Sequence, residues 1–235
     1  LSSLPEIWRR CYALPMMKCL PILLLLVILG SGCQKNNGDQ AAKETEAKPL
    51  TPIPAEVTLE FVRELWSQPH DEAGVIDQIK QYMRPGKWRN LRTFAPKGAT
   101  HSTNELSREL SREVKYVDRR FLVFQSRFEK LIDEGAISLE GAEIMGVITY
   151  DFKEKVLKYW EFATGEGNEG LELYMIGEPD ITFKHITWKS LKMPNSPPGW
   201  RMEFIQDIDD AREKLVAEGS MINGEETMVL IQDEM

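Results

Sequence analysis

The chain has 235 residues, of which 42% are hydrophobic, and its 29 basic and 37 acidic residues give a net charge of −8. This length provides for one domain with a sizeable core besides a terminal segment. The acidic balance speaks against a partner such as nucleic acid, whose phosphates are bound by basic surfaces.

A short apolar run, residues 20–29, is the first feature along the chain, and it ends in Gly30-Ser31-Gly32-Cys33. A basic residue before an apolar core, followed by small residues, is the pattern of a secretory signal; with a cysteine at the cut it is typical of a bacterial lipoprotein. A transmembrane helix needs about 20 apolar residues, and this run is shorter. We therefore expect residues 1–33 to be a signal peptide with a lipobox and Cys33 to be the lipidated residue.

Two details qualify the signal. Gly30 occupies the position where a lipobox usually has leucine, and Leu29 lies one residue further away. Met16-Met17-Lys18 would make a better start than Leu1, so we interpret residues 1–15 as an over-extended start. The expected location is the cell envelope of a bacterium. The expected membrane partner is reached through acyl chains such as palmitate on Cys33, since two or more chains give stable attachment.

Residues 34–55 contain no aromatic residue and almost no apolar pattern. Such a segment cannot bury enough surface to offset its ordering entropy, and we expect a flexible stalk. The remaining residues, 56–235, contain no cysteine. This body is expected to fold as one domain without disulfides.

The apolar pattern of the body changes period after Pro85-Gly86. Before it, apolar residues at helical spacing predict one or two helices, at residues 59–66 and 75–83. After it, a period of two predicts about ten strands with turn residues between them, which is typical of an antiparallel meander closed into a barrel or a sandwich. The predicted strands cover residues 88–94, 103–110, 120–128, 143–150, 156–162, 171–176, 181–191, 200–207, 214–218 and 226–231.

Short motifs in the body resemble a family of calycin-like bacterial lipoprotein barrels of unknown function. The likeness covers residues 75–231 and is carried by GKWRN at 86–90, DRRFLVF at 118–124, ITYD at 148–151, KYWEFATGEG at 158–167, ITWKS at 186–190 and WRMEF at 200–204. The resemblance implies a mainly β fold, a calycin-like antiparallel barrel with the early helices packed against or plugging one end.

Haem is the cofactor that more distant relatives of this family, the nitrobindin-type barrels, hold through a GxWxGxG turn and a late histidine. Here the turn reads GKWRNLR, and no histidine follows His185. We therefore expect no haem and no other cofactor. The three histidines, at positions 70, 101 and 185, are separated from one another and from any cysteine, so no metal site is predicted either.

Large aromatic residues of the strands are the candidate walls of a ligand cavity, because small barrels can enclose one ligand. The candidates are Trp88, Tyr150, Trp160, Phe162, Trp188 and Trp200, together with Arg120. The alternative is that these aromatic rings only fill the barrel. An inward arginine paired with a glutamate such as Glu105, Glu109 or Glu161 would mark a polar anchor, whereas the same charges on the outer face would only be solvated.

The function expected from these features is binding of a small, partly apolar ligand by an exported, lipid-anchored barrel. A packed structural or interaction module that docks a cell-envelope partner is the alternative. An enzyme is the weaker third hypothesis, since no catalytic motif is present and it would require a buried carboxylate with a raised pKa.

Overall fold

The computed structural model describes residues 49–96, 106–131, 143–164, 169–193, 199–222 and 226–235. They belong to the second of two compact units, Ala47–Met235. The predictions for the signal peptide, for Cys33 and for most of the stalk lie outside the described residues. Within these ranges, no helix has the length and apolarity that crossing a bilayer requires.

Two short helices precede the strands, as the helical apolar spacing predicts. Helix α1 spans Leu59–Ser67 and begins after Thr58, whose hydroxyl accepts a hydrogen bond from the backbone N–H of Phe61 at 3.3 Å. Such a cap satisfies one of the free donors of the first helical turn. Helix α2 spans Asp77–Tyr82 and is only six residues long.

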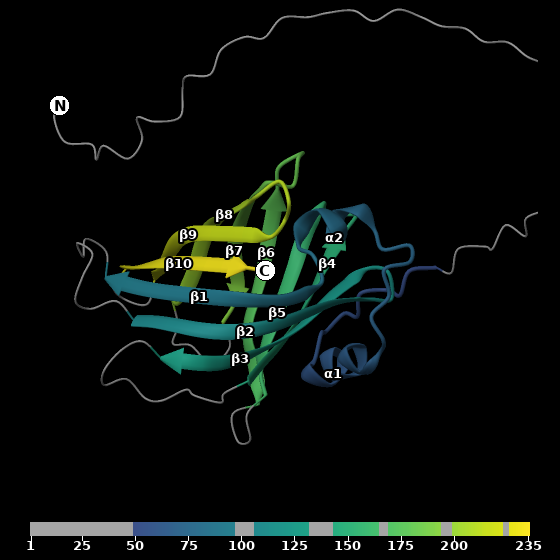
Figure 1. Cartoon of the computed structure of the whole chain (residues 1–235), viewed down its shortest axis with the longest axis horizontal. Coiled ribbons are helices and arrows are strands. Elements are labelled where there is room, and N and C mark those ends of the chain that lie inside the picture. Colours follow the sequence, from purple (N-terminus) through teal and green to yellow (C-terminus); the bar gives the residue numbers. More distant parts are fainter. Residues whose placement is uncertain (1–48, 97–105, 132–142, 165–168, 194–198, 223–225) are drawn as a thin grey trace, which may run out of the picture. The chain divides into compact units, whose positions relative to one another are not determined.

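Ten antiparallel strands form a closed barrel in which each strand pairs with the next and β10 returns to β1 (Figure 1). The prediction of a mainly β, antiparallel barrel of about ten strands with one or two helices before it is confirmed, with ten strands and two helices. The strands are β1 (Gly86–Pro96), β2 (Leu106–Val117), β3 (Phe121–Leu131), β4 (Glu143–Asp151), β5 (Val156–Ala163), β6 (Gly170–Pro179), β7 (His185–Lys192), β8 (Arg201–Ile208), β9 (Lys214–Ile222) and β10 (Glu226–Glu234).

The second strand differs most from its predicted bounds. The predicted strand ends at residue 110, whereas β2 continues to Val117 and pairs with both β1 and β3 along this stretch. Residues 111–113 read as polar, Ser-Arg-Glu, which hides the strand period. Arg112 nevertheless faces the interior, where it has polar partners, so the alternation continues through a charged residue.

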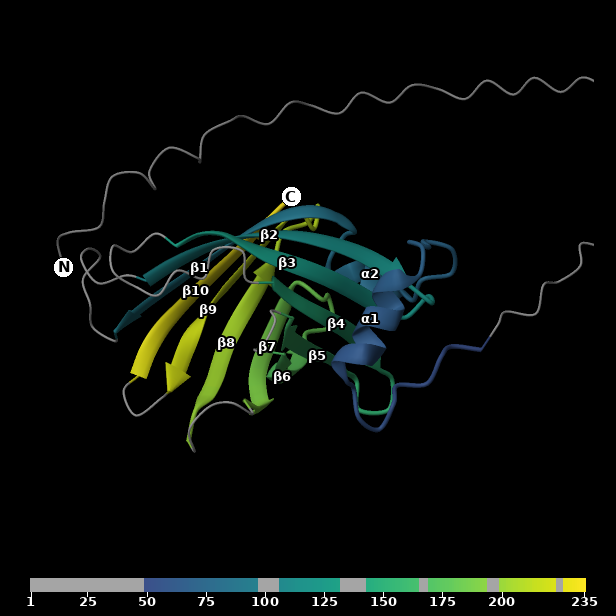
Figure 2. The ribbon, with the colours of Figure 1, turned by 90° about the horizontal axis from the view of Figure 1, so that it is seen from below.

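The two helices cover different parts of the barrel. Ile79 and Tyr82 of α2 belong to the same buried cluster as the inward side chains of the strands, and α2 closes one end of the barrel. Val62 and Leu65 of α1 belong to a second cluster, formed with the outward side chains of β3, β4 and β5. Figure 2 shows α1 beside β4. The chain therefore has apolar residues on both faces of these three strands.

Inward glycines make room for large rings from the neighbouring strand. Gly146 on β4 pairs with Phe124 on β3, and a Cβ atom at this glycine would overlap the phenylalanine ring. Gly177 on β6 likewise lies beneath Trp188 on β7, whose ring would be 2.8 Å from an added Cβ. The interior is thus packed by aromatic rings that occupy the space a side chain at each glycine would need.

Candidate functional site

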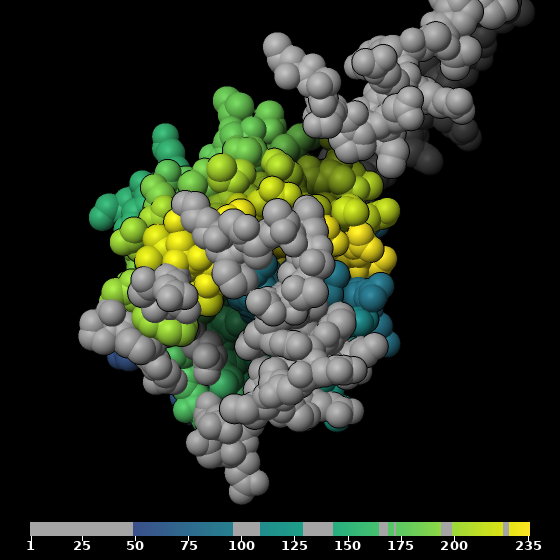
Figure 3. All heavy atoms as spheres, turned by 90° about the vertical axis from the view of Figure 1, so that its left-hand side faces the viewer, coloured from purple at the N-terminus to yellow at the C-terminus, as the bar shows by residue number. Residues whose placement is uncertain are grey.

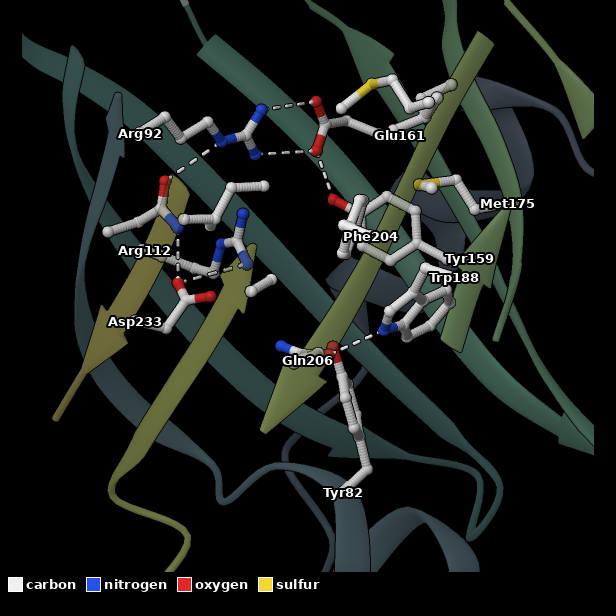
Figure 4. A pocket seen from close by; sticks show the side chains of 15 residues that line it. Tyr82, Arg92, Arg112, Tyr159, Glu161, Met175, Trp188, Phe204, Gln206 and Asp233 are labelled. Carbon is white, nitrogen blue, oxygen red and sulfur yellow. Dashed lines mark hydrogen bonds and ion pairs between the residues drawn. The ribbon is translucent and has the colours of Figure 1, made fainter. Parts of the chain in front are cut away.

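A cavity of about 50 Å³ lies in the middle of the barrel interior, beyond the side chains that α2 covers. The described residues of its walls come from α2 and from every strand except β3 and β4, and they divide into a polar and an apolar part (Figure 4). The polar part is formed by Asn90, Arg92, Arg112, Glu161, Gln206 and Asp233, and the apolar part by Leu173, Met175, Met202, Phe204, Ala217 and Ile231, with the rings of Tyr82, Tyr159 and Trp188 between them.

An ion pair crosses the interior between two strands that are not neighbours. The guanidinium of Arg92 on β1 donates to both carboxylate oxygens of Glu161 on β5, at 3.4 and 3.1 Å. The hydroxyl of Tyr159 donates to the same carboxylate. Burial alone would raise the pKa of Glu161, but the positive charges of Arg92 and Arg112 and these hydrogen bonds outweigh burial and lower the pKa below its ordinary range.

A second ion pair lies on the adjoining strands β10, β1 and β2. Asn90 donates to Asp233 at 2.7 Å, and a terminal nitrogen of Arg112 lies 3.6 Å from the same carboxylate oxygen. Arg112 also donates through Nε to the hydroxyl of Ser126 at 3.0 Å. Arg92 joins the two pairs, because its Nε donates to Asn90 at 3.1 Å.

The aromatic side of the cavity has a polar edge. The indole N–H of Trp188 donates to the side-chain oxygen of Gln206 at 2.7 Å. Tyr82 reaches the cavity from α2, and Phe204 packs beside Trp188 with ring centroids 6.3 Å apart. Burial, together with the negative charge of Asp233, raises the pKa of Tyr82 well above its ordinary value, so its hydroxyl stays protonated.

These groups supply hydrogen bonds and balanced charge to the cavity. Two arginines face two carboxylates, and every side chain of the polar wall except Gln206 takes part in the joined pairs. The carboxylate Glu161 has a lowered pKa, which makes it a weak base, the reverse of the raised pKa that the enzyme hypothesis requires. Among the described residues, no cluster of three or more histidine, cysteine or acidic side chains is arranged to hold a metal.

The structure brings few of the predicted cavity residues together. Trp188 lines the central cavity. Trp88 is buried in the same cluster as the apolar residues of α2, donates to the carbonyl of Arg84 at 3.0 Å, and lines a second hollow of about 310 Å³ beside β2 and β3. Trp200 is half-buried just before β8 and lines neither space.

The remaining candidates lie outside the cavity. Trp160 and Phe162 face outward and pack in the cluster beneath α1. Tyr150 lies at the α2 end, in edge contact with Phe152, with ring centroids 5.2 Å apart. Arg120 is buried in the turn before β3, where it donates to the carbonyls of Thr51 and Tyr150.

Of the charged residues considered for an inward pair, Glu161 faces the interior. Its partner is Arg92, which was not among the predicted site residues. Glu109 lies on the outer face and accepts from Arg89 at 2.7 Å, and Glu105 lies outside the described residues. Arg92 and Arg112 carried a usable signal, since each stands two residues from an inward-facing position of its strand. Gln206 carried the same signal, two residues after the inward-facing Phe204, whereas Asp233 lay beyond the predicted end of its strand at residue 231.

Together, the fold and the cavity define a class of protein: a closed ten-stranded antiparallel barrel with a polar-walled cavity in its interior. No model of a known protein family matches the chain. No curated protein matches it either. Among solved structures, the chain is similar to a DUF1329 family protein from Desulfovibrio piger, with 7% identity, a TM-score of 0.30, and coverage of 67% of this chain and 87% of that one. A likeness of this degree defines neither a shared fold nor a shared function.

Proposed function

We propose that this chain is an exported, lipid-anchored barrel protein that binds a small, partly apolar molecule in its interior. The observation that carries the proposal is the cavity itself, in which a wall of paired charges faces a wall of aliphatic and thioether side chains. Ligand pockets in proteins are usually apolar, with a few convergent polar groups that fix the orientation of the ligand.

The contrast between the two halves of the barrel supports a function for the polar wall. Toward α2, the interior is filled by apolar residues such as Ile79, Met83 and Leu215, each fully buried. Burying an ion pair is costly, and apolar residues of similar volume are often at least as stable. A barrel that only needed a filled core could therefore have continued the apolar packing through its middle.

The size of the cavity limits what it can hold. A volume of about 50 Å³ is room for a few water-sized groups, since a cavity needs roughly 10–15 Å³ to hold one water. The polar end of a ligand fits this space. An apolar remainder would extend along Met202 and Phe204, which are only partly buried, toward the end of the barrel where β1 finishes and β10 begins. This end faces the viewer in Figure 3. Among the described residues, no helix crosses that end.

A cavity-filling substitution tests the binding proposal. Ala217 lines the cavity and is 1% exposed. We expect Ala217→Leu to fill the cavity and to abolish uptake of hexan-2-one, a small and partly apolar probe, while the protein stays folded. Ala211→Leu, in the exposed turn between β8 and β9, is the matched control and leaves uptake unchanged. Uptake that survives Ala217→Leu would place binding elsewhere.

The anchor is supported by the sequence around Cys33 and is tested separately. Cys33→Ala abolishes incorporation of labelled fatty acid and releases the protein from the membrane fraction if Cys33 is acylated. Membrane association that persists in this variant, with residues 20–29 uncleaved, would instead favour a signal anchor.

An interaction module is the second candidate function, and the surface at the α2 end favours it. Ile181, in the turn between β6 and β7, is 98% exposed, and Phe152, in the turn between β4 and β5, is 50% exposed. The two turns meet through Tyr150, which contacts both Phe152 and Phe183. A protein of the cell envelope that docks here would bury both tips. In that case Ile181→Ser together with Phe152→Ser would weaken the complex and leave small-molecule uptake unaffected.

A further inference from the structure

The orientation of one buried amide indicates which chemical group the cavity accepts. Gln206 is 5% exposed, and its side-chain oxygen accepts from the indole N–H of Trp188 at 2.7 Å. Because an indole nitrogen can only donate, the oxygen of Gln206 must face the tryptophan. The amide nitrogen therefore points the other way, into the cavity (Figure 4).

This nitrogen has hydrogen-bonding capacity to spare. It carries two N–H groups, and within the described part of the chain the Tyr82 hydroxyl is the one further group that interacts with the Gln206 side chain besides Trp188. At most one N–H is taken by that hydroxyl. The other is directed at cavity space, where an acceptor of a ligand would meet it.

Arg112 offers a second donor to the same space. A guanidinium has five N–H groups. In Arg112, Nε donates to Ser126 and one terminal nitrogen lies near Asp233, which leaves the other terminal nitrogen without a hydrogen-bond partner among the described residues. The side chain is 5% exposed, and its guanidinium lies over the Phe124 ring at 4.5 Å, so it is held in place.

The formal charges around the cavity are already balanced. Arg92 is paired with Glu161, and Arg112 with Asp233. A ligand with a carboxylate or an ammonium group would bring one uncompensated charge into the interior, which is costly in a medium of low polarity. An uncharged acceptor satisfies the spare donors and leaves the balance intact.

We propose that the cavity binds molecules whose polar end is an uncharged carbonyl, such as a ketone, an ester or an amide, attached to an apolar chain. The carbonyl oxygen accepts from the amide nitrogen of Gln206 and from the free terminal nitrogen of Arg112. The apolar chain of the ligand lies along Met202 and Phe204. This inference rests on the proposed function and specifies its ligand.

The test compares three probes of equal chain length: hexan-2-one, hexanoate and hexylammonium. The full chain in lipid nanodiscs is titrated calorimetrically with each probe near pH 7, and empty nanodiscs serve as the blank. We expect hexan-2-one to bind about tenfold or more tightly than either ion, because one net hydrogen bond and one avoided buried charge together amount to at least that factor. Hexanoate or hexylammonium binding as tightly as the ketone would overturn this inference and leave the interior site standing. Binding of none of the three would overturn both the inference and the proposed function.

A pair of matched variants locates the contact. Gln206→Leu removes the amide from the cavity, and Gln125→Leu removes an amide from the outer face of β3. We expect Gln206→Leu to lose the preference for the ketone over hexanoate and Gln125→Leu to retain it. A preference that is unchanged in a folded Gln206→Leu protein contradicts the assignment of the amide. If that variant does not fold, the order of the three probes on the unmodified protein decides the matter alone.

Discussion

Arg92 and Glu161, 69 positions apart in the sequence, form a two-point ion pair across the barrel interior, from β1 to β5. Four strand-to-strand interfaces separate these strands along the shorter arc of the barrel. The pair therefore fixes the distance between opposite walls, and through Asn90 it is joined to Asp233 and Arg112. The cavity owes its shape to this connection.

Removing one partner of the pair should destabilise the protein strongly. In Arg92→Met the Glu161 carboxylate stays buried without its counter-charge, and loss of one member of a buried pair costs about 3–5 kcal/mol. Urea unfolding of the full chain measures the change. The double variant Arg92→Met with Glu161→Met removes both charges, and we expect it to be more stable than Arg92→Met alone. A double variant less stable than either single variant would show that the pair is more than a charge balance.

Acid should weaken the contribution of Glu161. The pKa of this carboxylate is below its ordinary value of 4.5 in the folded protein, although burial opposes the shift, because Arg92 and its hydrogen bonds favour the charged form. Since the unfolded chain takes up the proton at higher pH than the folded one, the stability that this group contributes is complete above pH 4.5. It declines as the pH falls below that value and is lost once the pH passes the folded pKa.

Glu161→Gln isolates this effect. The difference in unfolding free energy between the unmodified protein and Glu161→Gln should shrink as the pH is lowered from 6 through the acid range. The salt bridge of Asp151 with Lys158 also titrates in acid, but it is present in both proteins and cancels. A difference that is constant with pH would mean that the carboxylate has an unshifted pKa.

Gly146 should not tolerate a side chain. The ring of Phe124 occupies the space that a Cβ atom would need, and both are held in adjacent strands. Forcing extra atoms into a packed core costs about 1–3 kcal/mol, so Gly146→Ala should lower the melting temperature. Adding Phe124→Leu makes room and should recover part of the loss. A Gly146→Ala protein as stable as the original would show that Phe124 moves freely.

Two tryptophans on opposite faces of the wall should behave differently. Trp160 stacks on Tyr174 beneath α1, with ring centroids 5.0 Å apart, and Trp188 holds Gln206 at the cavity. Both Trp160→Phe and Trp188→Phe should destabilise the protein by a modest amount. Only Trp188→Phe should weaken binding of hexan-2-one, because it removes the group that orients Gln206. Equal losses of binding in calorimetric titrations would contradict the division between the two faces.

The fold could be predicted from the sequence because its strands alternate in apolar character and its turns contain glycine, proline and aspartate. The predicted element at residues 156–162 coincides almost completely with β5, and that at residues 143–150 with β4. The helical stripe at residues 75–83 contains α2, and that at residues 59–66 covers α1 except for its last residue, Ser67. Local patterns determine these elements, whereas their number and order fit a sandwich as well as the closed barrel that the structure has.

The cavity walls could not be predicted in the same way, because β4 and β5 are buried on both faces. Trp160 and Phe162 alternate with Tyr159 and Glu161, and α1 covers the first pair while the barrel encloses the second. Alternation alone does not tell which set faces inward. The partners of Glu161 were hidden for another reason: Arg92 lies on a strand that only meets β5 across the closed barrel.

Native mass spectrometry of the full chain, released from purified membranes without exchange of its bound contents, tests most directly whether the barrel holds a small molecule. We expect one co-purified uncharged carbonyl compound per chain, lost in Ala217→Leu and retained in Ala211→Leu. The proposal is contradicted if the unmodified protein and both variants are free of any small molecule and the unmodified protein takes up none of the three six-carbon probes.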